Sequence, residues 1–422
     1  MKKKNNIVIL CGQYYPNAGA PVNCFLPYIK ELKKENAVTI VCRKTSGISV
    51  LNYDDTEPFI QLTTWYNSLR YFLVDRIKER KHIKLYTYLL NIVRFISFIR
   101  TMFCYPTQHN WIIKKYLRTL NAIEKRIGQI DVIISVSFPF CSHIAALNFK
   151  KDHPQVKWLT YSTDPFTFNE CQYERVPFKS FKRRWARKKE KEIYDKADAN
   201  IVTEELYSML VESFKQRKEK TIPFPYLILP SLHGMSRHFS TNQKIINCVY
   251  AGSLYTDIRN PRIMIKLFEK IRQNIKLKLF ADGDLTIRGL LKEIHCENIE
   301  VNGLVNRKEY ERIIKEEADI LINIGNTTLL QSPSKLLELV STGKPIINFY
   351  SNEDFGYQVI KVYPLGLNIS NKVLEDDSVT IVENFCFKNM GVILPFELIK
   401  NLYPNHIMEN HMKILNSLVS QH

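Results

Sequence analysis

The chain contains 422 residues, of which 45% are hydrophobic and 24% are charged. These values are typical of globular proteins with buried cores, so they exclude an extended disordered protein, and the length favours two domains of about 200 residues each. The formal net charge of +18 at pH 7 indicates an anionic partner, and charge alone leaves open whether that partner is a membrane surface or nucleic acid.

The cysteines and the apolar runs predict where the protein works. The nine cysteines never form a C-x-x-C pair, so we expect no metal site, and reduced thiols in a cytoplasmic protein. The apolar run 7–11 is too short for the core of a signal peptide. Residues 85–99 form the longest apolar-rich stretch, but Asn91 and Arg94 interrupt it and it falls short of the roughly 20 residues that span a bilayer. We therefore expect no transmembrane helix.

The first half of the chain, residues 1–225, alternates between strand and helix patterns. Strand–helix–strand units at this spacing predict parallel pairing with right-handed crossovers, and hence a doubly wound, Rossmann-like α/β domain. Residues 182–191 resemble a solvated basic helix face. The predicted strands are 7–11, 37–42, 131–136, 157–162 and 200–203, and the predicted helices include 22–34 and 181–196.

Residues 65–127 interrupt this alternation. The segment is helical by pattern and carries 13 Lys or Arg against three acids, interleaved with Trp, Tyr and Phe. A basic segment with aromatic anchors is typical of proteins that lie on an anionic membrane face. We therefore predict that this segment holds the protein peripherally at the inner face of the membrane, and we expect no nucleic-acid partner because no nucleic-acid-binding module is visible.

After a stretch rich in proline the α/β pattern starts again. Residues 226–242 are predicted to be a linker, 243–400 a second Rossmann-like domain, and 401–422 a C-terminal helix that packs back on the first domain. Ligands in open α/β sheets bind at the carboxyl ends of the strands, so two such domains predict a central cleft. The predicted strands of the second domain are 247–251, 276–280, 299–302, 320–324 and 345–349.

Residues 331–345 carry the clearest candidate site. A Ser-Pro pair suits the start of a helix, and Gly343 suits its left-handed end. The free N–H groups of this helix start, together with Lys335, predict a phosphate-binding site. Glu338 follows Ser334 by one turn, and its carboxylate could accept both hydroxyls of a ribose. The alternative is a well-capped helix with a surface ion pair.

This stretch reads P-S-K-L-x-E-x-x-x-x-G-K-P and resembles the donor-site helix of GT-B glycosyltransferases, especially the family 4 type. Four segments upstream resemble further motifs of that family, in its order: 250–261, 279–284, 298–305 and 318–322. In the first half, Tyr14-Tyr15-Pro16 with Gly19 resembles the Y-x-P-x-x-G loop. Residues 137–139 with His143, Trp158 and Asp164-Pro165 resemble a series found in relatives that act on lipid- or polysaccharide-linked acceptors.

The resemblance implies a GT-B fold and a metal-independent transfer from a nucleotide-diphosphate sugar, with retention at the anomeric carbon. Arg259 and Lys335 would hold the diphosphate, Ser334 would bond to its oxygens, Glu338 would take the ribose, and backbone near 303–305 would read the base. Asp164 and His143 are candidate catalytic residues or acceptor contacts, although either could equally be a turn or core residue. The other implied donor-side residues are Gly19, Gly252, Ser253, Asn260, Gly283, Asp284, Gly303, Val305 and Leu336.

The sequence departs from the family pattern at one position. The family often has two Glu residues seven apart, the second matching Glu338, and Leu330 stands where the first would be. The donor sugar and the stereochemistry are therefore left open, and Gln331 or Asn326 could supply polar contacts instead.

Other functions remain as alternatives. A nicotinamide oxidoreductase is disfavoured, because no G-x-G-x-x-G follows the first strand. A sugar-nucleotide epimerase of related fold would turn over the donor without an acceptor. A non-catalytic protein that binds membranes is permitted by the charge, but charge governs association and says nothing of chemistry.

Overall fold

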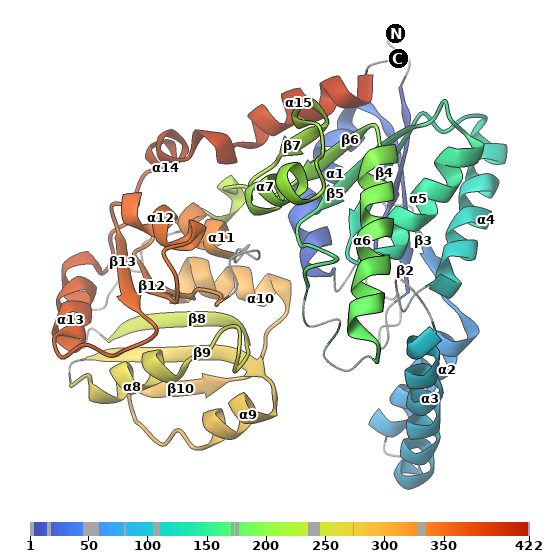
Figure 1. Cartoon of the computed structure of the whole chain (residues 1–422). Helices are drawn as coiled ribbons and strands as arrows, with labels where there is room; N and C mark the ends of the chain where they lie inside the picture. The colour runs from blue at the N-terminus through green and yellow to red at the C-terminus, as the bar shows by residue number, and fades with distance from the viewer. Residues whose placement is uncertain are drawn as a thin grey trace. The chain divides into compact units, whose positions relative to one another are not determined.

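A computed structural model describes most of the chain. The described residues are 4–14, 18–44, 59–79, 82–103, 110–169, 173, 177–234, 245–272, 274–327 and 335–420. The chain divides into two units, each with its own sheet (Figure 1). Unit 1 comprises Met1–Pro225 with Glu409–His422, and unit 2 comprises Tyr226–Met408.

Unit 1 is built on a seven-stranded parallel sheet in the order β3-β2-β1-β4-β5-β6-β7. An order that grows outward on both sides of β1 requires crossovers on both faces, so the predicted doubly wound sheet is confirmed. The strands are β1 (Asn6–Leu10), β2 (Ala37–Arg43), β3 (Phe59–Leu62), β4 (Val132–Ser137), β5 (Lys157–Ser162), β6 (Ala199–Val202) and β7 (Thr221–Pro223).

Helices cover both faces of this sheet. All six residues of β4 are buried, as expected for a parallel strand covered on both faces. The helices of unit 1 are α1 (Ala20–Glu35), α2 (Trp65–Lys78), α3 (Ile83–Phe103), α4 (Asn110–Ile127), α5 (Cys141–Asp152), α6 (Lys179–Lys196), α7 (Glu204–Ser213) and α15 (Met408–Ser420).

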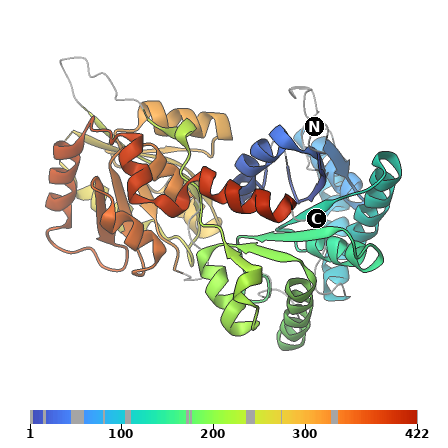
Figure 2. The same ribbon diagram turned by 90° about the horizontal axis from the view of Figure 1, so that it is seen from above.

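The C-terminal helix α15 packs on unit 1. The Oη atom of Tyr28 in α1 lies 2.6 Å from Nδ1 of His411 in α15. The imidazole ring of His411 also stacks on Phe224, with ring centroids 4.5 Å apart. Figure 2 shows α15 beside α1 in this unit. Contacts across nearly the whole length of the chain therefore close the fold of unit 1.

Two long helices project from the carboxyl end of β3. The α2 and α3 helices form a hairpin that extends from the sheet of unit 1 (Figure 1). A small core holds the hairpin together, with Tyr66 and Leu73 of α2 packed against Leu90 and Val93 of α3. No helix in the described part of the chain is long and apolar enough to cross a membrane.

Unit 2 has a six-stranded parallel sheet in the order β10-β9-β8-β11-β12-β13, which is also doubly wound. The strands are β8 (Ile246–Leu254), β9 (Ile275–Gly283), β10 (Ile299–Asn302), β11 (Ile320–Ile324), β12 (Ile346–Tyr350) and β13 (Gly366–Ser370).

The helices of unit 2 surround this sheet and bury its apolar strands. They are α8 (Arg262–Lys270), α9 (Leu285–Lys292), α10 (Arg307–Arg312) continued by a wider turn (Ile313–Glu317), α11 (Lys335–Ser341), α12 (Phe355–Val362), α13 (Ser378–Asn389) and α14 (Phe396–Leu402).

The segment predicted to be a linker, 226–242, is partly incorporated into unit 2. Just before it, Thr221–Pro223 adds an edge strand, β7, to the sheet of unit 1. The backbone N–H of Leu229 donates to Oγ of Ser341 in unit 2 at 2.8 Å, and Leu232 is buried in the same core. Proline-rich composition indicated irregular backbone here, but apolar residues between the prolines gain from burial against their neighbours.

Candidate active site

Some of the predicted donor residues, among them Arg259 and Lys335, lie at the carboxyl ends of β8 and β11, which are neighbours in the sheet of unit 2. The chain reverses after β8 through reciprocal backbone hydrogen bonds between Tyr255 and Arg259, 3.0 and 3.2 Å long. This turn brings Arg259 back over the strand end, where Nη1 donates to the carbonyl oxygen of Ser253 at 3.4 Å. The guanidinium also donates from Nε and Nη2 to Oδ1 of Asn326, at 3.1 and 2.8 Å.

Lys335 lies close to the same strand end. Its Nζ donates to the carbonyl oxygen of Ala251 at 3.3 Å and lies 4.9 Å from the ring centroid of Tyr310. A Cβ atom on Gly252 would lie 3.3 Å from Oη of Tyr250 and 3.5 Å from this Nζ, so the glycine backbone packs against both side chains. Burial lowers the pKa of Lys335, Glu338 opposes that shift, and Arg259 and Arg307 add to it. The ammonium is therefore short of water and close to two other cations, an environment that favours an anion.

Glu338 is bonded to a cation that the sequence did not single out. Nη1 of Arg307 donates to both carboxylate oxygens of Glu338, at 2.8 and 3.0 Å, and Nε of the same guanidinium donates to Glu311 at 2.6 Å. The carboxylate is 17% exposed. Two acids beside Arg307 raise its pKa, so the guanidinium stays charged at any physiological pH.

Two tyrosines enclose these charges. The ring of Tyr310 lies beneath both cations, 5.4 Å from the Arg307 guanidinium carbon and 4.9 Å from Nζ of Lys335. Tyr250 is buried, and its Oη donates to the carbonyl oxygen of Ser253 at 3.1 Å. Burial raises the pKa of Tyr250, so both aromatic residues shape the site as neutral walls.

Sequence reasoning missed Arg307 and Tyr310 as site residues, although one signal was present. Asn306 and Glu309 are spaced as an N-cap and its third helical residue, and Oδ1 of Asn306 accepts from the N–H of Glu309 at 3.0 Å. That pattern fixes the first turn of α10 directly after the segment predicted to read the base. It therefore places Arg307 at the entrance of the site.

Four of the implied donor residues have evident structural roles. A Cβ atom on Gly283 would lie 2.5 Å from the carbonyl oxygen of Leu254, so this glycine allows β8 and β9 to meet α9 closely. Asp284 caps α9 and also accepts from the N–H of Thr256 at 2.7 Å. Asn260 bonds within its own loop, to Thr256 at 3.1 Å. Leu336 is fully buried, so its side chain belongs to the core and only its backbone could meet a ligand.

Other implied donor residues lie at surfaces or outside the described residues. Gly303 is exposed and Val305 is half-buried, in the loop that follows β10. Gly19 precedes α1 in unit 1, and no atom lies within 4 Å of where its Cβ would be. Gly343 has a φ of +75°, which confirms the predicted left-handed end of the α11 helix. Ser334, Leu330 and Gln331 lie outside the described residues, as do Tyr15 and Pro16.

The two catalytic candidates of unit 1 differ in access. His143 is fully buried in α5, with Nδ1 2.7 Å from Oγ of Ser135 and Nε2 3.0 Å from Oγ of Ser162. Burial lowers the pKa of His143 to about 3, so the ring is neutral. This environment favours the alternative of a core histidine.

Asp164 follows β5 at the carboxyl edge of the sheet and is half-buried. Burial raises the pKa of its carboxyl group, to which Oγ1 of Thr163 donates at 3.1 Å. The nearby backbone is fixed by Glu190 of α6, which accepts from the N–H groups of Phe166 and Thr167 at 3.1 and 2.8 Å. Asp164 is therefore the better placed of the two candidates to meet a ligand.

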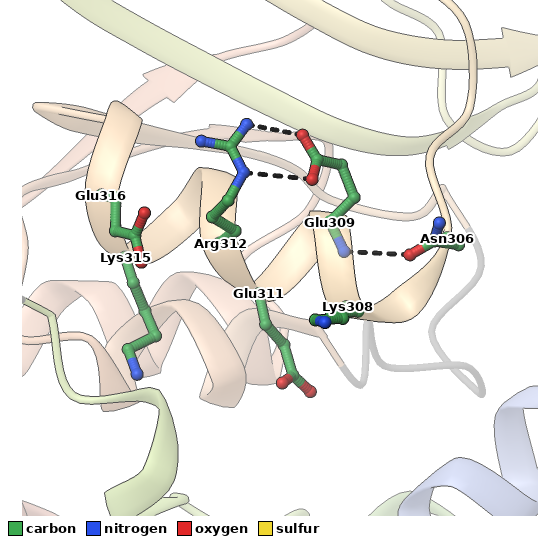
Figure 3. Close-up of a pocket in the computed structure, with 7 residues that line it drawn as sticks. All are labelled: Asn306, Lys308, Glu309, Glu311, Arg312, Lys315 and Glu316. Atoms are coloured by element: carbon green, nitrogen blue, oxygen red, sulfur yellow. Dashed lines mark hydrogen bonds and ion pairs between the residues drawn. The ribbon is translucent and has the colours of Figure 1, made fainter.

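A separate cavity of about 490 Å³ lies along α10. Figure 3 shows that two of its charged groups pair with each other, since Arg312 donates to Glu309 through two hydrogen bonds of 3.0 and 2.5 Å. None of the predicted donor residues lines it. Among the described residues, no group of three His, Cys, Asp or Glu is placed to hold a metal ion.

The sequence matches no protein-family model and no curated protein, but solved structures share its fold. The lipopolysaccharide outer core galactosyltransferase WaaB, in its apo form, is 13% identical with a TM-score of 0.55, over 98% of this chain and 99% of that one. HepE from Anabaena, in complex with UDP and glucose, is 10% identical with a TM-score of 0.60, over 97% and 99%. A TarM variant from S. aureus, in complex with Fondaparinux, alpha-GlcNAc-glycerol and UDP, is 12% identical with a TM-score of 0.60, over 99% and 100%.

The chain has the GT-B fold. Its two Rossmann-like units correspond to those of these glycosyltransferases over nearly their full length. At identities of 10 to 13% the likeness concerns the fold, so the chemistry has to come from the residues of the site. In this GT-B chain those residues are two half-buried cations, Lys335 and Arg259, the carboxylate of Glu338 and a third cation, Arg307, a set that suits a ligand with both a diphosphate and hydroxyl groups.

Proposed function

We propose that the chain is a glycosyltransferase that takes a sugar from a nucleotide-diphosphate sugar. The observation that carries this proposal is the meeting of Lys335, Arg259 and Glu338 at the carboxyl edge of the unit 2 sheet. In this assignment unit 2 binds the donor and unit 1 binds the acceptor. HepE was solved with UDP and glucose, which supports a uridine nucleotide as the first donor to test.

The chemistry follows from charge. When the bond between the anomeric carbon and the β-phosphate oxygen breaks, the sugar becomes oxocarbenium-like and the nucleoside diphosphate leaves as an anion. Lys335 and Arg259 stabilise that anion with fixed positive charge. The oxygen of an acceptor hydroxyl then bonds to the anomeric carbon, on the face from which the phosphate left, and its proton passes to the departing phosphate. The configuration is thereby retained, and no step requires a metal ion.

Glu338 holds the ribose in this scheme. Its two oxygens already share Nη1 of Arg307, and an ionised carboxylate has lone pairs for further donors. Two ribose hydroxyls can therefore join the existing ion pair without breaking it. Backbone of residues 303–305, directly before Arg307, would read the base.

The acceptor is a polysaccharide or a lipid-linked glycan, in the synthesis of a bacterial-type surface polysaccharide such as a capsule, an O-antigen or an exopolysaccharide. WaaB is a lipopolysaccharide outer core galactosyltransferase, and the TarM variant was solved with Fondaparinux and alpha-GlcNAc-glycerol, which supports a glycan acceptor. The basic segment 65–127 supports a site of action on the cytoplasmic face of the membrane. Asp164 is the residue of unit 1 that we assign to the acceptor or the transferred sugar.

The experiment is a release assay with a panel of nucleotide-sugars. We expect one donor to release its nucleoside diphosphate, slowly to water and faster when a glycan or lipid-linked acceptor is added. Isomerised donor without released nucleoside diphosphate would support the alternative of an epimerase. If no donor in the panel binds or reacts, the enzyme assignment is wrong and a non-catalytic membrane-binding protein becomes the better reading.

A further inference from the structure

The α3 helix presents a broad apolar surface that no other described part of unit 1 covers. One side of α3 packs on α2 through Leu90 and Val93, and the opposite side repeats large apolar residues at intervals of three and four. A contiguous exposed surface of this kind marks a contact site. The exposed apolar residues of α3 are Ile83, Leu85, Tyr88, Leu89, Ile92, Phe95, Ile96, Phe98, Ile99 and Phe103.

The charges of α3 indicate what covers this surface. Between Ile83 and Phe103 there is no Asp or Glu, and the charged residues are Lys84, Arg94 and Arg100. A second copy of the helix would bring like charges together with no acidic partner on α3, whereas paired helices usually carry opposite charges beside the apolar seam. The exposed apolar arc is also broader than a seam between two helices requires. Both features favour an anionic lipid surface.

A second helix of unit 1 combines aromatic and basic residues on an exposed face. Residues 178–189 contain seven Lys or Arg and no acid. Phe178 and Phe181 at the start of α6 are 77% and 67% exposed, and Trp185 is 48% exposed. Arg184 and Lys188 are exposed as well. The positions 181, 184, 185 and 188 lie on one face of the helix, so rings and cations point the same way. The sequence alone had indicated only a solvated basic face here.

The topology places both features at the same edge of the sheet. The α2–α3 hairpin follows the carboxyl end of β3, and α6 begins after the segment that follows the carboxyl end of β5. All strands of this sheet are parallel, so these carboxyl ends share one edge (Figure 1). Asp164, directly after β5, lies at that edge too.

We propose that α3 and the first turns of α6 form one docking face that rests on an anionic lipid bilayer. The apolar side of α3 lies in the membrane plane, buried about 5–10 Å into the headgroup region, while α6 contributes lipid-facing rings and phosphate-binding cations. This surface extends the membrane contact of segment 65–127 to a second helix. It rests on the proposed function only in placing the acceptor edge of unit 1 against the membrane.

The test is flotation of the full-length protein with vesicles. One set is phosphatidylcholine with 30% phosphatidylglycerol and the other is phosphatidylcholine alone, each at low and at physiological salt. We expect binding to the anionic vesicles at least ten times stronger than to the neutral ones, and weaker in higher salt. Such a preference follows because each Lys or Arg near an anionic surface contributes about five-fold in affinity.

Two variants separate the contributions of the helices. The first, Ile92→Gln with Phe95→Gln and Ile96→Gln, removes apolar contact from the exposed side of α3, and should lower binding to both vesicle types by about 100-fold. The second, Arg184→Gln with Lys188→Gln, removes two charges from α6 and should lower only the anionic binding, by about 25-fold. The matched controls are Ile381→Gln with Phe387→Gln on α13 of unit 2, and Lys33→Gln with Lys34→Gln at the end of α1. The first control replaces two exposed apolar residues and the second replaces two basic residues, all on surfaces outside the docking face, and both should bind as the wild type does.

The outcomes distinguish the docking face from the enzyme assignment. Both docking variants should hydrolyse a soluble donor in detergent-free buffer as fast as the wild type does. If the wild type itself hydrolyses no donor, that result contradicts the proposed function and leaves the docking proposal untouched. The docking proposal is overturned if the α6 variant binds anionic vesicles like the wild type. It is also overturned if the wild type ignores vesicles and sediments as a dimer that the α3 variant turns into a monomer, since the occupant would then be a second copy of the chain.

Discussion

Each unit holds a polar cluster beside its parallel sheet, and the two clusters differ in burial and in charge. In unit 1, His143 bonds to two serines in a fully buried setting where its pKa of about 3 keeps it neutral. In unit 2, three basic side chains, Lys335, Arg259 and Arg307, meet the carboxyl group of Glu338 at a partly exposed strand end. A neutral cluster with every ring nitrogen bonded stabilises the fold, whereas an excess of cations with access to water is prepared for an anion. Both contain residue types that a sequence motif can flag as catalytic.

The largest expected effect is on the charged cluster. Replacing Lys335 by Ala should lower donor turnover by about 100- to 1000-fold, because one fixed cation is lost where the leaving group gains its charge. The unfolding temperature should change little, since the side chain is only half-buried. Lys308→Ala on neighbouring α10 removes an equal charge from an exposed position and should retain turnover within two-fold. Equal losses in both variants would mean that Lys335 acts only through the overall charge.

The neutral cluster should respond in the opposite way. Replacing His143 by Ala should lower the free energy of unfolding by about 2–4 kcal/mol, because it opens a cavity and removes one buried hydrogen bond from each of Ser135 and Ser162. Turnover per folded molecule should stay within a few-fold. Chemical denaturation and donor release, measured on the same samples, check this prediction. A variant with normal stability but lost turnover would instead indicate that His143 is a catalytic residue.

The same histidine predicts a pH signature. Its pKa in the folded state is about 3, below the usual value of about 6.5 in an unfolded chain. The unfolded state therefore binds the extra proton between these values, and the wild type loses stability as the pH falls below about 6.5. Denaturation of the wild type and of the His143→Ala variant should therefore show that the difference between their free energies of unfolding becomes smaller as the pH falls from 7 to 4. A constant gap would contradict the buried, neutral histidine.

Two glycines test how closely β8, β9 and α9 pack beside the donor site. Gly283→Ala should cost about 1–3 kcal/mol of stability, because the new Cβ would lie 2.5 Å from the carbonyl oxygen of Leu254. Gly289→Ala, within α9 and with no atom within 4 Å of its Cβ position, should stabilise by up to about 1 kcal/mol. Thermal unfolding of both variants decides the sign of each effect, and a neutral Gly283→Ala would contradict the close packing.

The smallest effect concerns alkaline pH. Burial lowers the pKa of Lys335 in the free protein, while a bound diphosphate favours the ammonium form. Donor affinity should therefore be full below that pKa and fall by up to about ten-fold per pH unit above it. Lys335→Arg keeps its charge throughout this range, so its affinity should stay level. If donor affinity falls equally with pH in the wild type and in the Lys335→Arg variant, a group other than Lys335 is responsible for the titration.

The sequence predicted most strands, because parallel strands buried on both faces read as short apolar runs. Strands 157–162, 299–302 and 320–324 coincide with β5, β10 and β11. The short edge strands β3 and β7 escaped notice, since four or three residues carry too little pattern. Edge strands gain their pairing from the sheet that is already present, and this context is absent from local sequence.

The candidate site was predictable where side chains repeat a family pattern and unpredictable where tertiary contacts decide. Lys335, Arg259 and Glu338 were predicted as donor residues because their spacing matches a motif, and the structure places them close together. Arg307 and Tyr310 were missed because their role depends on α10 lying beside α11. Arg307 and Glu338, which bond to each other, are 31 residues apart in the sequence. Burial of His143 depends on α5 covering β4 and β5, which its neighbours in sequence do not reveal.

The most direct test of the central claim is calorimetric titration of nucleoside diphosphates into the wild type and the Lys335→Ala variant. The cluster at the carboxyl edge of unit 2 should bind at least one nucleoside diphosphate, and bind its monophosphate more weakly because the β-phosphate contacts are lost. The variant should bind the diphosphate 10 to 100 times more weakly, as expected for one charge-assisted contact in a half-buried site. No binding of any nucleotide, or equal affinity in both proteins, would contradict the claim that these cations form a diphosphate site.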